Sequence, residues 1–576
     1  MSEDTSVAAD LARIYTAAAG SDDGQRCMCA PAPELQERLV HALRAARDRI
    51  GHDVPLSRLK ADLPRPPTPG FNDGLIIPGT HFRLGTPPAT VRRAAAERAP
   101  LRGTVRIVVV LVDFSDQEML ADPAHFEQLF FSQNQLATGS VRDYFHEVTH
   151  GLIDLQGEVV GPYRLPQTMA HYANGQSGGS TIQPNMRTMA QDTAVLSDPD
   201  VNFALYDNDN NGFVDAFIVV HAGPGAEVTG SPGDLWSSKW VLPSAFPADG
   251  ASIYAFLTIP EDARIGVTAH EIGHLVFGWP DLYDTDESSN GIGNWCLMGS
   301  GNWNGGGDTP AHPSAWCKAG QGWVSVVNHA ADATVPFEDV KDSHLVHRLW
   351  RNGEPSTEYF LVENRQRTRF DAQLPGDGLL IWHIDDSVGD NTDETHYQVA
   401  LEQADGLLHL ENLINRGDGG DSYPGTANNR DFSGTSTPSS NSYAGTPTSV
   451  AVTDLSNSAT TMTARIQVTG AVAPPFPGRL LRQPPLMQGA DVLQWQTQMV
   501  VRGHAITADG IYGPMSEQAC RALQAHAGLV VDGIVGPNTW QATWTAATQP
   551  TAELGEDERV PSPRAEAEAT DLQGTT

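Results

Sequence analysis

The stretch TAHEIGHLVFGWPDLYD, residues 268–284, determines the expected fold, because it contains two histidines and a glutamate in the spacing HExxH. Residues four apart lie on one face of a helix, so His270 and His274 can both direct an imidazole nitrogen at one Zn²⁺. Glu271 then lies beside the metal, where its carboxylate can take a proton from zinc-bound water. The alternative, a core helix with two hydrogen-bonded histidines, gives no packing reason for a buried histidine pair beside a glutamate.

A third metal ligand is expected just after this helix. The helix should end at Gly278 and Pro280, which turn the chain back. Three acidic residues follow the turn, and one of them is placed to be an oxygen ligand: Asp281, Asp284 or Asp286. Such a ligand leaves the fourth tetrahedral position open for water and substrate.

The segments before the zinc helix predict an α/β catalytic domain. The β-branched run Arg106 to Phe114 is typical of a strand buried on both faces, and Phe217 to His221 is a second such strand. Between them, SVRDYFHEVTHG indicates a helix that opens at Ser140 and closes at Gly151. Residues 252–259 resemble a strand, and we expect this strand to pair with an extended substrate.

The length of 576 residues requires several folding units. After residue 335 short alternating segments indicate antiparallel β-structure, and near the end DGIYGP at 509–514 recurs as DGIVGP at 532–537, each followed by a helical pattern. The expected parts are an accessory, propeptide-like segment 1–100, a zinc metallopeptidase catalytic domain 101–335, an antiparallel β domain 336–470, a linker 471–485, a small C-terminal domain 486–545 and a disordered acidic tail 546–576.

Composition excludes several partners. The formal net charge of -34, from 70 acidic and 36 basic residues, repels phosphate backbones, so nucleic acid is not expected to bind. The longest apolar runs have the length of strands and fall far below the roughly 20 residues that span a bilayer. The amino terminus, MSEDTSVAAD, lacks the basic and apolar regions of a signal peptide, and by itself predicts a chain that stays inside the cell.

A calcium loop is predicted at residues 207–215, DNDNNGFVD, which reproduce the first nine positions of an EF-hand loop. The predicted ligands are Asp207, Asp209, Asn211, Phe213 through its backbone, and Asp215. Ile218 replaces the bidentate glutamate of position twelve, so an ion would need further ligands from elsewhere in the fold. The alternative is an Asx-rich turn before a strand. Residues 418–421 are a second candidate, for which an ordinary acidic turn explains the pattern equally well.

The five cysteines are too few for a disulfide scaffold. Cys27 and Cys29 lie in the accessory segment, where a thiolate could occupy the open zinc position and keep the enzyme latent. The alternative is that these thiols have no role. A disulfide between Cys296 and Cys317 is compatible with the sequence, although the spacing alone does not support it.

The zinc segment resembles the immune inhibitor A family of bacterial metallopeptidases, relatives of the metzincins. The resemblance extends from about residue 25 to about residue 470, and its further matching stretches are GFNDG at 70–74, VDFSD at 112–116, SVRDYFHEVTHG at 140–151, WCLMGSGNWNG at 295–305, EYFLVENRQ at 358–366 and GLLIWHID at 378–385. It implies a metzincin-like catalytic domain, export from the cell, and calcium in addition to zinc.

The resemblance also implies roles for single residues. His270 and His274 would bind zinc, Glu271 would be the general base, Asp281 the third ligand, and Met298 the Met-turn beneath the metal. The familiar pattern is HExxHxxGxxD, whereas here the glycine and the aspartate each lie one residue later. This departure keeps Asp284 as the rival of Asp281.

Residues 486–545 resemble the peptidoglycan-binding type 1 module, which implies a small three-helix fold that holds cell-wall polymer. The combined prediction is a zinc endopeptidase that hydrolyses protein and is targeted to the cell wall, outside the cell. One alternative is an endopeptidase that cuts the peptide cross-links of peptidoglycan. Another is a non-catalytic wall-binding protein with a relic peptidase fold, against which the intact His270, Glu271 and His274 argue.

Overall fold

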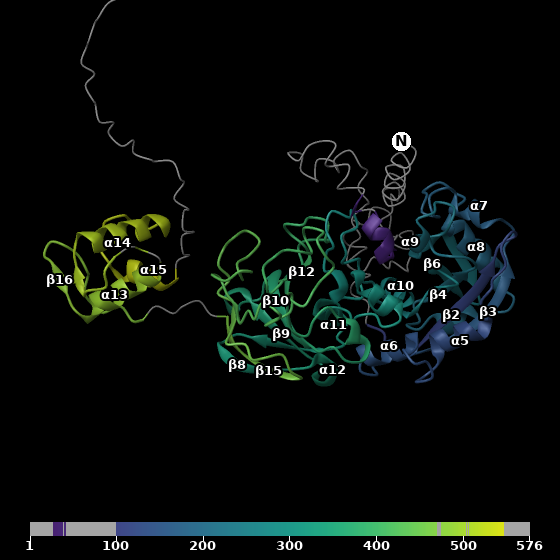
Figure 1. Cartoon of the computed structure of the whole chain (residues 1–576), viewed down its shortest axis with the longest axis horizontal. Helices are drawn as coiled ribbons and strands as arrows, with labels where there is room; N and C mark the ends of the chain where they lie inside the picture. The colour runs from purple at the N-terminus through teal and green to yellow at the C-terminus, as the bar shows by residue number, and fades with distance from the viewer. Residues whose placement is uncertain are drawn as a thin grey trace, which may run out of the picture. The chain divides into compact units, whose positions relative to one another are not determined.

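A computed structural model describes residues 27–38, 40–41, 100–468, 474–502, 504 and 506–545 of the chain. The chain divides into two compact units, residues 1–470 and 471–576, and each unit is described by itself (Figure 1). Most of the predicted accessory segment and all of the predicted acidic tail lie outside the described residues. Among the described residues, every helix is too short or too polar to cross a membrane.

The first unit contains a six-stranded sheet with the strand order β1, β5, β6, β4, β2, β3. Its strands are β1 (Cys27–Met28), β2 (Gly103–Asp113), β3 (Ile153–Arg164), β4 (Phe217–His221), β5 (Ser238–Ala248) and β6 (Ala251–Pro260). Strands β3, β2, β4 and β6 run parallel to one another. Strand β5 is antiparallel to β6, and β1 is antiparallel to β5. The two buried strands that the sequence predicts, β2 and β4, lie side by side in the sheet.

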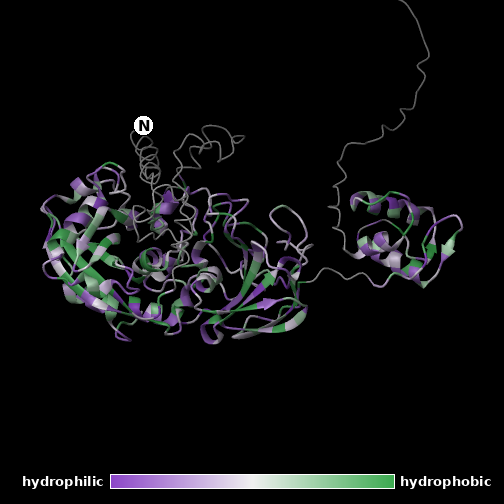
Figure 2. Ribbon diagram, turned by 180° about the vertical axis from the view of Figure 1, so that it is seen from behind, coloured by the Kyte–Doolittle hydropathy of each residue, from purple (hydrophilic) through white to green (hydrophobic). Residues whose placement is uncertain are grey.

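Helices cover this sheet, as the sequence predicts for an α/β domain. Those that contact its strands are α5 (Pro123–Phe131), α6 (Val141–Val148), α8 (Met186–Ser197) and α10 (Ile265–Phe277). The same unit contains the shorter helices α7 (Met169–Ala173), which packs against α8, and α9 (Ala226–Thr229). The predicted start of α6 at Ser140 is confirmed, because the Ser140 and Asp143 side chains form a reciprocal capping box. Figure 2 shows hydrophobic residues concentrated on the strands that these helices cover.

The strand that could accept an added peptide is not the predicted one. Residues 252–259 lie in β6, and β6 is hydrogen-bonded on both sides, to β4 and to β5. Its backbone groups are therefore used, and the prediction of substrate pairing there is wrong. The edge strand on this side of the sheet is the two-residue β1, in which Cys27 and Met28 pair with Lys239 and Ser238 of β5. A peptide could pair with β5 only in place of β1.

Two smaller sheets follow in the same unit, with the orders β12, β11, β10, β9, β7 and β13, β14, β15, β8. Their strands are β7 (Ser325–His329), β8 (Ala333–Glu338), β9 (Leu345–Trp350), β10 (Glu358–Arg365), β11 (Gly378–Asp385), β12 (Val399–Leu401), β13 (Asp431–Phe432), β14 (Ala451–Thr453) and β15 (Thr461–Gln467). All pairings are antiparallel, as predicted, except that of β7 with β9. Two short helices, α11 (Ala315–Gly320) and α12 (Val340–Ser343), precede β7 and β9 respectively.

Among the described residues of the second unit there are three helices, the number that the resemblance to the peptidoglycan-binding module implies. They are α13 (Ala490–Val501), α14 (Pro514–His526) and α15 (Pro537–Thr545), with a short ladder of β16 (Met487–Gln488) and β17 (Ile511–Tyr512). The repeated Asp-Gly turns are built alike. The amide group of Gln496 donates to Asp509 Oδ1 at 3.1 Å, and that of Gln524 donates to Asp532 Oδ1 at 2.7 Å. These turns therefore have a structural role, because each is fixed by a buried glutamine.

Candidate metal centre

Helix α10 brings the predicted zinc ligands together. His270 Nε2 lies 3.0 Å from His274 Nε2, and Asp281 Oδ1 lies 3.1 Å and 3.0 Å from these two nitrogens. All three side chains are buried. Three potential ligand atoms thus form a nearly equilateral triangle, contributed by one turn of helix and the loop after it.

The other ring nitrogens fix the tautomers of both histidines. His270 Nδ1 lies 3.0 Å from the carbonyl oxygen of Leu297, and His274 Nδ1 lies 2.6 Å from that of Trp279. A carbonyl oxygen only accepts, so each Nδ1 carries the hydrogen and each Nε2 presents a lone pair. Burial lowers the pKa of His274, and Asp281 offsets part of this effect while His270 adds to it. The lowered pKa favours the neutral imidazole that a metal requires.

These residues fit a zinc ion. Two lone pairs and a carboxylate oxygen that converge in a buried space attract a cation and repel one another without one. Zn²⁺ bonds of 2.0–2.1 Å at tetrahedral angles separate neighbouring ligand atoms by about 3.3 Å. The separations of 3.0–3.1 Å are close to this value, and the donor set of two imidazoles and one carboxylate is one that zinc uses.

The end of α10 accommodates the extra residue in the motif. The helix runs to Phe277 and ends at Gly278, whose φ of 66° is the left-handed conformation that favours glycine. The N–H of Trp279 donates to the carbonyl of Gly273 at 3.1 Å. This tight turn directs Asp281 back toward the helix, so one more residue before the glycine does not displace the carboxylate from the centre.

The rival aspartates lie elsewhere. Asp284 Oδ2 accepts hydrogen bonds from the Ser288 hydroxyl at 2.6 Å and from the Ser289 N–H at 2.8 Å. Asp284 Oδ1 accepts from the N–H of Asp286 at 3.0 Å, and Asp286 in turn accepts from the N–H of Ser288. Both carboxylates therefore shape the loop after the helix, whereas Asp281 faces the histidines.

Met298 lies in a turn beneath the helix, as the family resemblance implies. A Cβ placed on Gly273 would lie 2.8 Å from the Met298 sulfur, so only glycine allows the turn to approach the helix this closely. The preceding residue, Leu297, provides the carbonyl that orients His270. The turn thus supports the ligand set from below through the backbone and through packing.

Glu271 is buried beside the ligand triangle. Neither of its carboxylate oxygens has a hydrogen-bond partner among the described residues. Burial, together with the charges of Asp281 and Glu227, raises the pKa of Glu271 well above its ordinary value, and Lys239 offsets only part of this rise. Sequence reasoning missed Lys239, because it comes from strand β5, more than thirty residues away.

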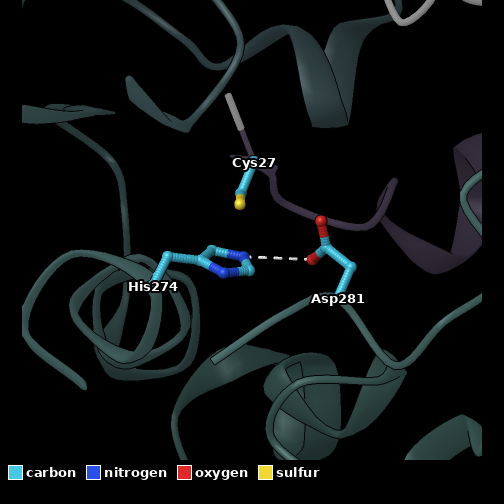
Figure 3. Close-up of side chains that lie close together, drawn as sticks. All are labelled: Cys27, His274 and Asp281. Carbon is cyan, nitrogen blue, oxygen red and sulfur yellow. Dashed lines mark hydrogen bonds and ion pairs between the residues drawn. The ribbon is translucent and has the colours of Figure 1, made fainter. Parts of the chain in front are cut away.

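The structure also brings a cysteine to the centre. The ligand atoms of Cys27, His274 and Asp281 lie within 4.8 Å of one another, and Figure 3 shows the Cys27 sulfur pointing toward the space between the other two side chains. Cys29 is not part of this group. Cys296 and Cys317, for which the sequence leaves a disulfide open, are buried free thiols joined by a hydrogen bond.

The predicted calcium loop brings its carboxylates together. Ligand oxygens of Asp207, Asp209 and Asp215 lie within 4.8 Å of one another. The loop is closed by N–H donors of Asn211 and Gly212, which bond to the Asp207 carboxylate at 2.9 Å each. Phe213 and Asn211 lie in the same turn, since the Phe213 N–H donates to Asn211 Oδ1 at 2.9 Å. Ile218 is buried in β4, and its apolar side chain offers no ligand atom to an ion.

The two aspartates of the second acidic stretch, residues 418–421, have different surroundings. Asp418 lies within 4.8 Å of Asp405 and His409, measured between their ligand atoms. Asp421 instead accepts hydrogen bonds from the Trp295 indole at 2.9 Å and from the N–H of Asp418 at 2.9 Å. Asp421 therefore has a structural role, because its carboxylate holds the loop against Trp295.

Comparison with known proteins agrees with this geometry. Residues 101–325 match the model of the immune inhibitor A peptidase M6 catalytic domain, and residues 488–542 match that of a "Putative peptidoglycan binding domain". The pre-pro-metalloprotease PrtV of Vibrio cholerae is 29% identical over 37% of this chain and 29% of its own length. Immune inhibitor A of Bacillus thuringiensis subsp. alesti is 28% identical over 42% of this chain and 46% of its own length.

The chain thus spans less than half the length of the curated relatives it matches. Within the chain, the first match ends at residue 325 and includes the whole of helix α10 and the loop that follows it. The two matched ranges are separated by residues 326–487, which include the two smaller β-sheets. Residues 101–325 therefore correspond to the catalytic domain of the immune inhibitor A M6 metallopeptidases, and residues 488–542 correspond to a putative peptidoglycan-binding domain.

Proposed function

We propose that this chain is a zinc-dependent endopeptidase that hydrolyses peptide bonds of protein substrates, with His270, His274 and Asp281 as the zinc ligands and Glu271 as the general base. The observation that supports this most directly is the convergence of two oriented Nε2 lone pairs and one carboxylate oxygen beside a buried carboxylate without a hydrogen-bond partner. A structural role for such a cluster would leave its lone pairs unsatisfied.

The residues around the centre suggest how hydrolysis proceeds. A zinc ion, when bound, activates water and polarises the scissile carbonyl. The Glu271 carboxylate takes the proton of the attacking water and delivers it to the leaving amine. The Glu271 carboxylate is fully buried on the turn of helix that also carries His270 and His274, so it lies beside the centre. The outer edge of β5 can hold an extended substrate by backbone hydrogen bonds, which favours flexible protein segments over folded ones.

The test is a comparison of zinc content and proteolysis in the wild-type chain and in Glu271→Gln. We expect the variant to retain zinc, because Glu271 is not a ligand, and to lose casein cleavage by about 100-fold or more, because a general base contributes about 10² to 10⁴ in rate. Chelation should abolish wild-type activity, and zinc should restore it. Substantial casein cleavage by Glu271→Gln would contradict the mechanism.

The C-terminal unit is proposed to hold the peptidase at the cell wall, which places its action outside the cell. The peptidoglycan-binding match at residues 488–542 supports this, as do relatives described as a pre-pro-metalloprotease and an immune inhibitor. The second candidate is cleavage of peptidoglycan cross-links by the same centre, favoured only by that module. Digestion of casein against purified cell wall distinguishes the two.

The division of the first unit at residue 335 also remains a proposal, because one apolar cluster includes side chains from both sides of it.

We further propose that Asp207, Asp209, Asn211, the Phe213 carbonyl and Asp215 bind Ca²⁺. The grouped carboxylates and the closed turn support this proposal. Asp215 is fully buried, and a buried carboxylate is stabilised by a cation nearby. The role of the ion would be structural, since the loop leads directly into β4.

A further inference from the structure

We propose that residues 27–36 occupy the substrate groove and that the Cys27 thiolate is the fourth ligand of the metal, so that the chain retains only a small fraction of its proteolytic activity. This inference rests on the proposed zinc site and adds its regulation. The supporting observation is the position of the Cys27 sulfur, which shares a 4.8 Å cluster with His274 and Asp281 and points into the space between them (Figure 3).

The segment is bound as an extended peptide would be. Cys27 and Met28 add a strand to the outer edge of β5, next to helix α10. The N–H of Cys29 continues this pairing by donating to the Ser237 carbonyl at 3.0 Å. A substrate that pairs with β5 needs the same backbone groups, so the segment and a substrate cannot be bound together.

Side chains of the catalytic domain hold the carbonyl groups of the segment. The Tyr283 hydroxyl donates to the Met28 carbonyl at 2.7 Å. The indole N–H groups of Trp236 and Trp303 donate to the carbonyls of Cys29 and Ala30 at 2.8 Å and 2.9 Å. Three successive carbonyls are therefore recognised without regard to side-chain identity, which is how a groove for varied peptide substrates would work.

The far end of the segment is anchored as well. Leu35 packs with Ala226 and Trp236 in a separate apolar cluster. Gln36 donates to Asn290 at 3.0 Å and accepts from Arg416 at 3.3 Å. These contacts reach the loop after α10 and the β-sheet region, so the segment is attached along its whole described length.

The two cysteines of the segment have different surroundings. Cys29 Sγ accepts a hydrogen bond from the Asn302 side chain at 3.1 Å and donates to the adjacent Ala30 carbonyl, away from the ligand triangle. Burial and the charges of Glu227, Glu271 and Asp281 raise the pKa of the Cys29 thiol well above its ordinary value. The Cys29 sulfur is thus engaged by Asn302 and the Ala30 carbonyl, whereas the Cys27 sulfur lies with the ligand atoms of His274 and Asp281.

Thiolate is among the strongest zinc ligands in proteins, and two imidazoles, one carboxylate and one thiolate make a closed tetrahedral set. On binding, the thiol loses its proton to solvent and donates an electron pair from sulfur to the metal. A closed set leaves no position for water or for a substrate carbonyl. Release of the segment from β5 reopens both the metal and the groove.

The experiment uses the full-length chain loaded with Co²⁺ in place of zinc, since a thiolate ligand gives cobalt a strong near-ultraviolet charge-transfer band. We compare wild type, Cys27→Ser and the matched control Cys29→Ser, which makes the same change two residues away. We expect the band in wild type and in Cys29→Ser and its loss in Cys27→Ser. Alkylation mapped on the unmutated chain should modify Cys27 only after the metal is removed.

Proteolysis provides the second measurement. Zinc-loaded Cys27→Ser should cleave casein at least about tenfold faster than wild type, because a plug bound in more than nine of ten molecules suppresses activity by that factor. Cys29→Ser should behave as wild type. Cobalt binding without a thiolate band in wild type, or an unchanged band in Cys27→Ser, would overturn this inference alone. Failure of all three proteins to bind cobalt would instead overturn the proposed zinc site.

Discussion

At the scale of single residues, the centre depends on which atom of each side chain is engaged. His270 and His274 each use Nδ1 on a backbone carbonyl, which leaves both Nε2 atoms for a metal. Asp281 provides the third atom of the triangle, whereas Asp284 is occupied by two serines of its own loop. Two aspartates three residues apart thus have separate tasks.

This difference predicts the metal content of two variants. Asp281→Ala should lower zinc affinity by about 100-fold or more, because even partners of ligands contribute 10-fold to 100-fold. Asp284→Ala, the matched control, should retain stoichiometric zinc and lose stability instead, since it removes a buried acceptor of several hydrogen bonds. Zinc analysis after gel filtration measures both. Full zinc retention by Asp281→Ala would refute the assignment.

At the scale of elements, the loop before β4 is arranged for a structural ion. The carboxylates of Asp207 and Asp209 both accept the N–H of Asn211, which holds the turn closed. We expect calcium at 100 times its dissociation constant to stabilise the fold by about 2.7 kcal/mol.

Thermal unfolding with and without calcium tests this. A stabilisation of that size raises the melting temperature of a unit with more than 150 residues by several degrees, at about 2–4 °C for each kcal/mol. Asp207→Asn with Asp209→Asn should abolish the calcium-dependent shift. Asp418→Asn, in the other acidic loop, is the control and should leave the shift intact. An equal shift in both variants would exclude calcium binding at residues 207–215.

Strand β10 explains a matching stretch to which the sequence assigned no role. Glu363 and Arg365 are buried; Glu363 pairs with Lys318 at 2.7 Å, and Arg365 pairs with Asp371. The indole of Trp382 donates to Glu363 at 3.1 Å. This paired and hydrogen-bonded set links helix α11 to the five-stranded sheet, so the stretch at 358–366 has a structural role at some distance from the metal ligands.

At the scale of the whole molecule, the chain consists of two compact units with separate apolar clusters. The second unit has its own core around Trp495, Tyr512 and Trp540. A unit with its own core can fold without the other. Catalysis and wall binding are therefore predicted to be separable properties of this chain.

Removal of residues 471–576 should leave the casein activity of the first unit unchanged and abolish its sedimentation with purified peptidoglycan. The isolated segment 471–576 should sediment with peptidoglycan and cleave nothing. The full-length chain with Glu271→Gln is the control, because it should bind the wall without proteolysis. Equal sedimentation of the full-length and shortened chains would contradict the role proposed for the second unit.

Sequence alone determined the elements whose cause is local. The spacing of His270 and His274 predicts that both lie on one face of a helix, and α10 has this arrangement. Ser140 predicts the start of α6, which the structure confirms. Buried strands β2 and β4 follow from β-branched runs. Each of these features depends on side chains within a few residues of one another, so a linear pattern contains the required information.

Tertiary structure decided what depends on distant segments. Only the sheet order shows that β6 is internal and that β5 pairs on its outer side with the amino-terminal strand β1. Only the folded chain distinguishes Asp281 from Asp284. The turn at Gly278 places the Asp281 carboxylate beside His274, whereas the Asp284 carboxylate accepts a hydrogen bond from Ser288. The approach of Cys27 to a helix some 250 residues away depends on strand pairing and on carbonyl contacts with residues throughout the domain. Such contacts are fixed by packing across the sequence, and no local spacing records them.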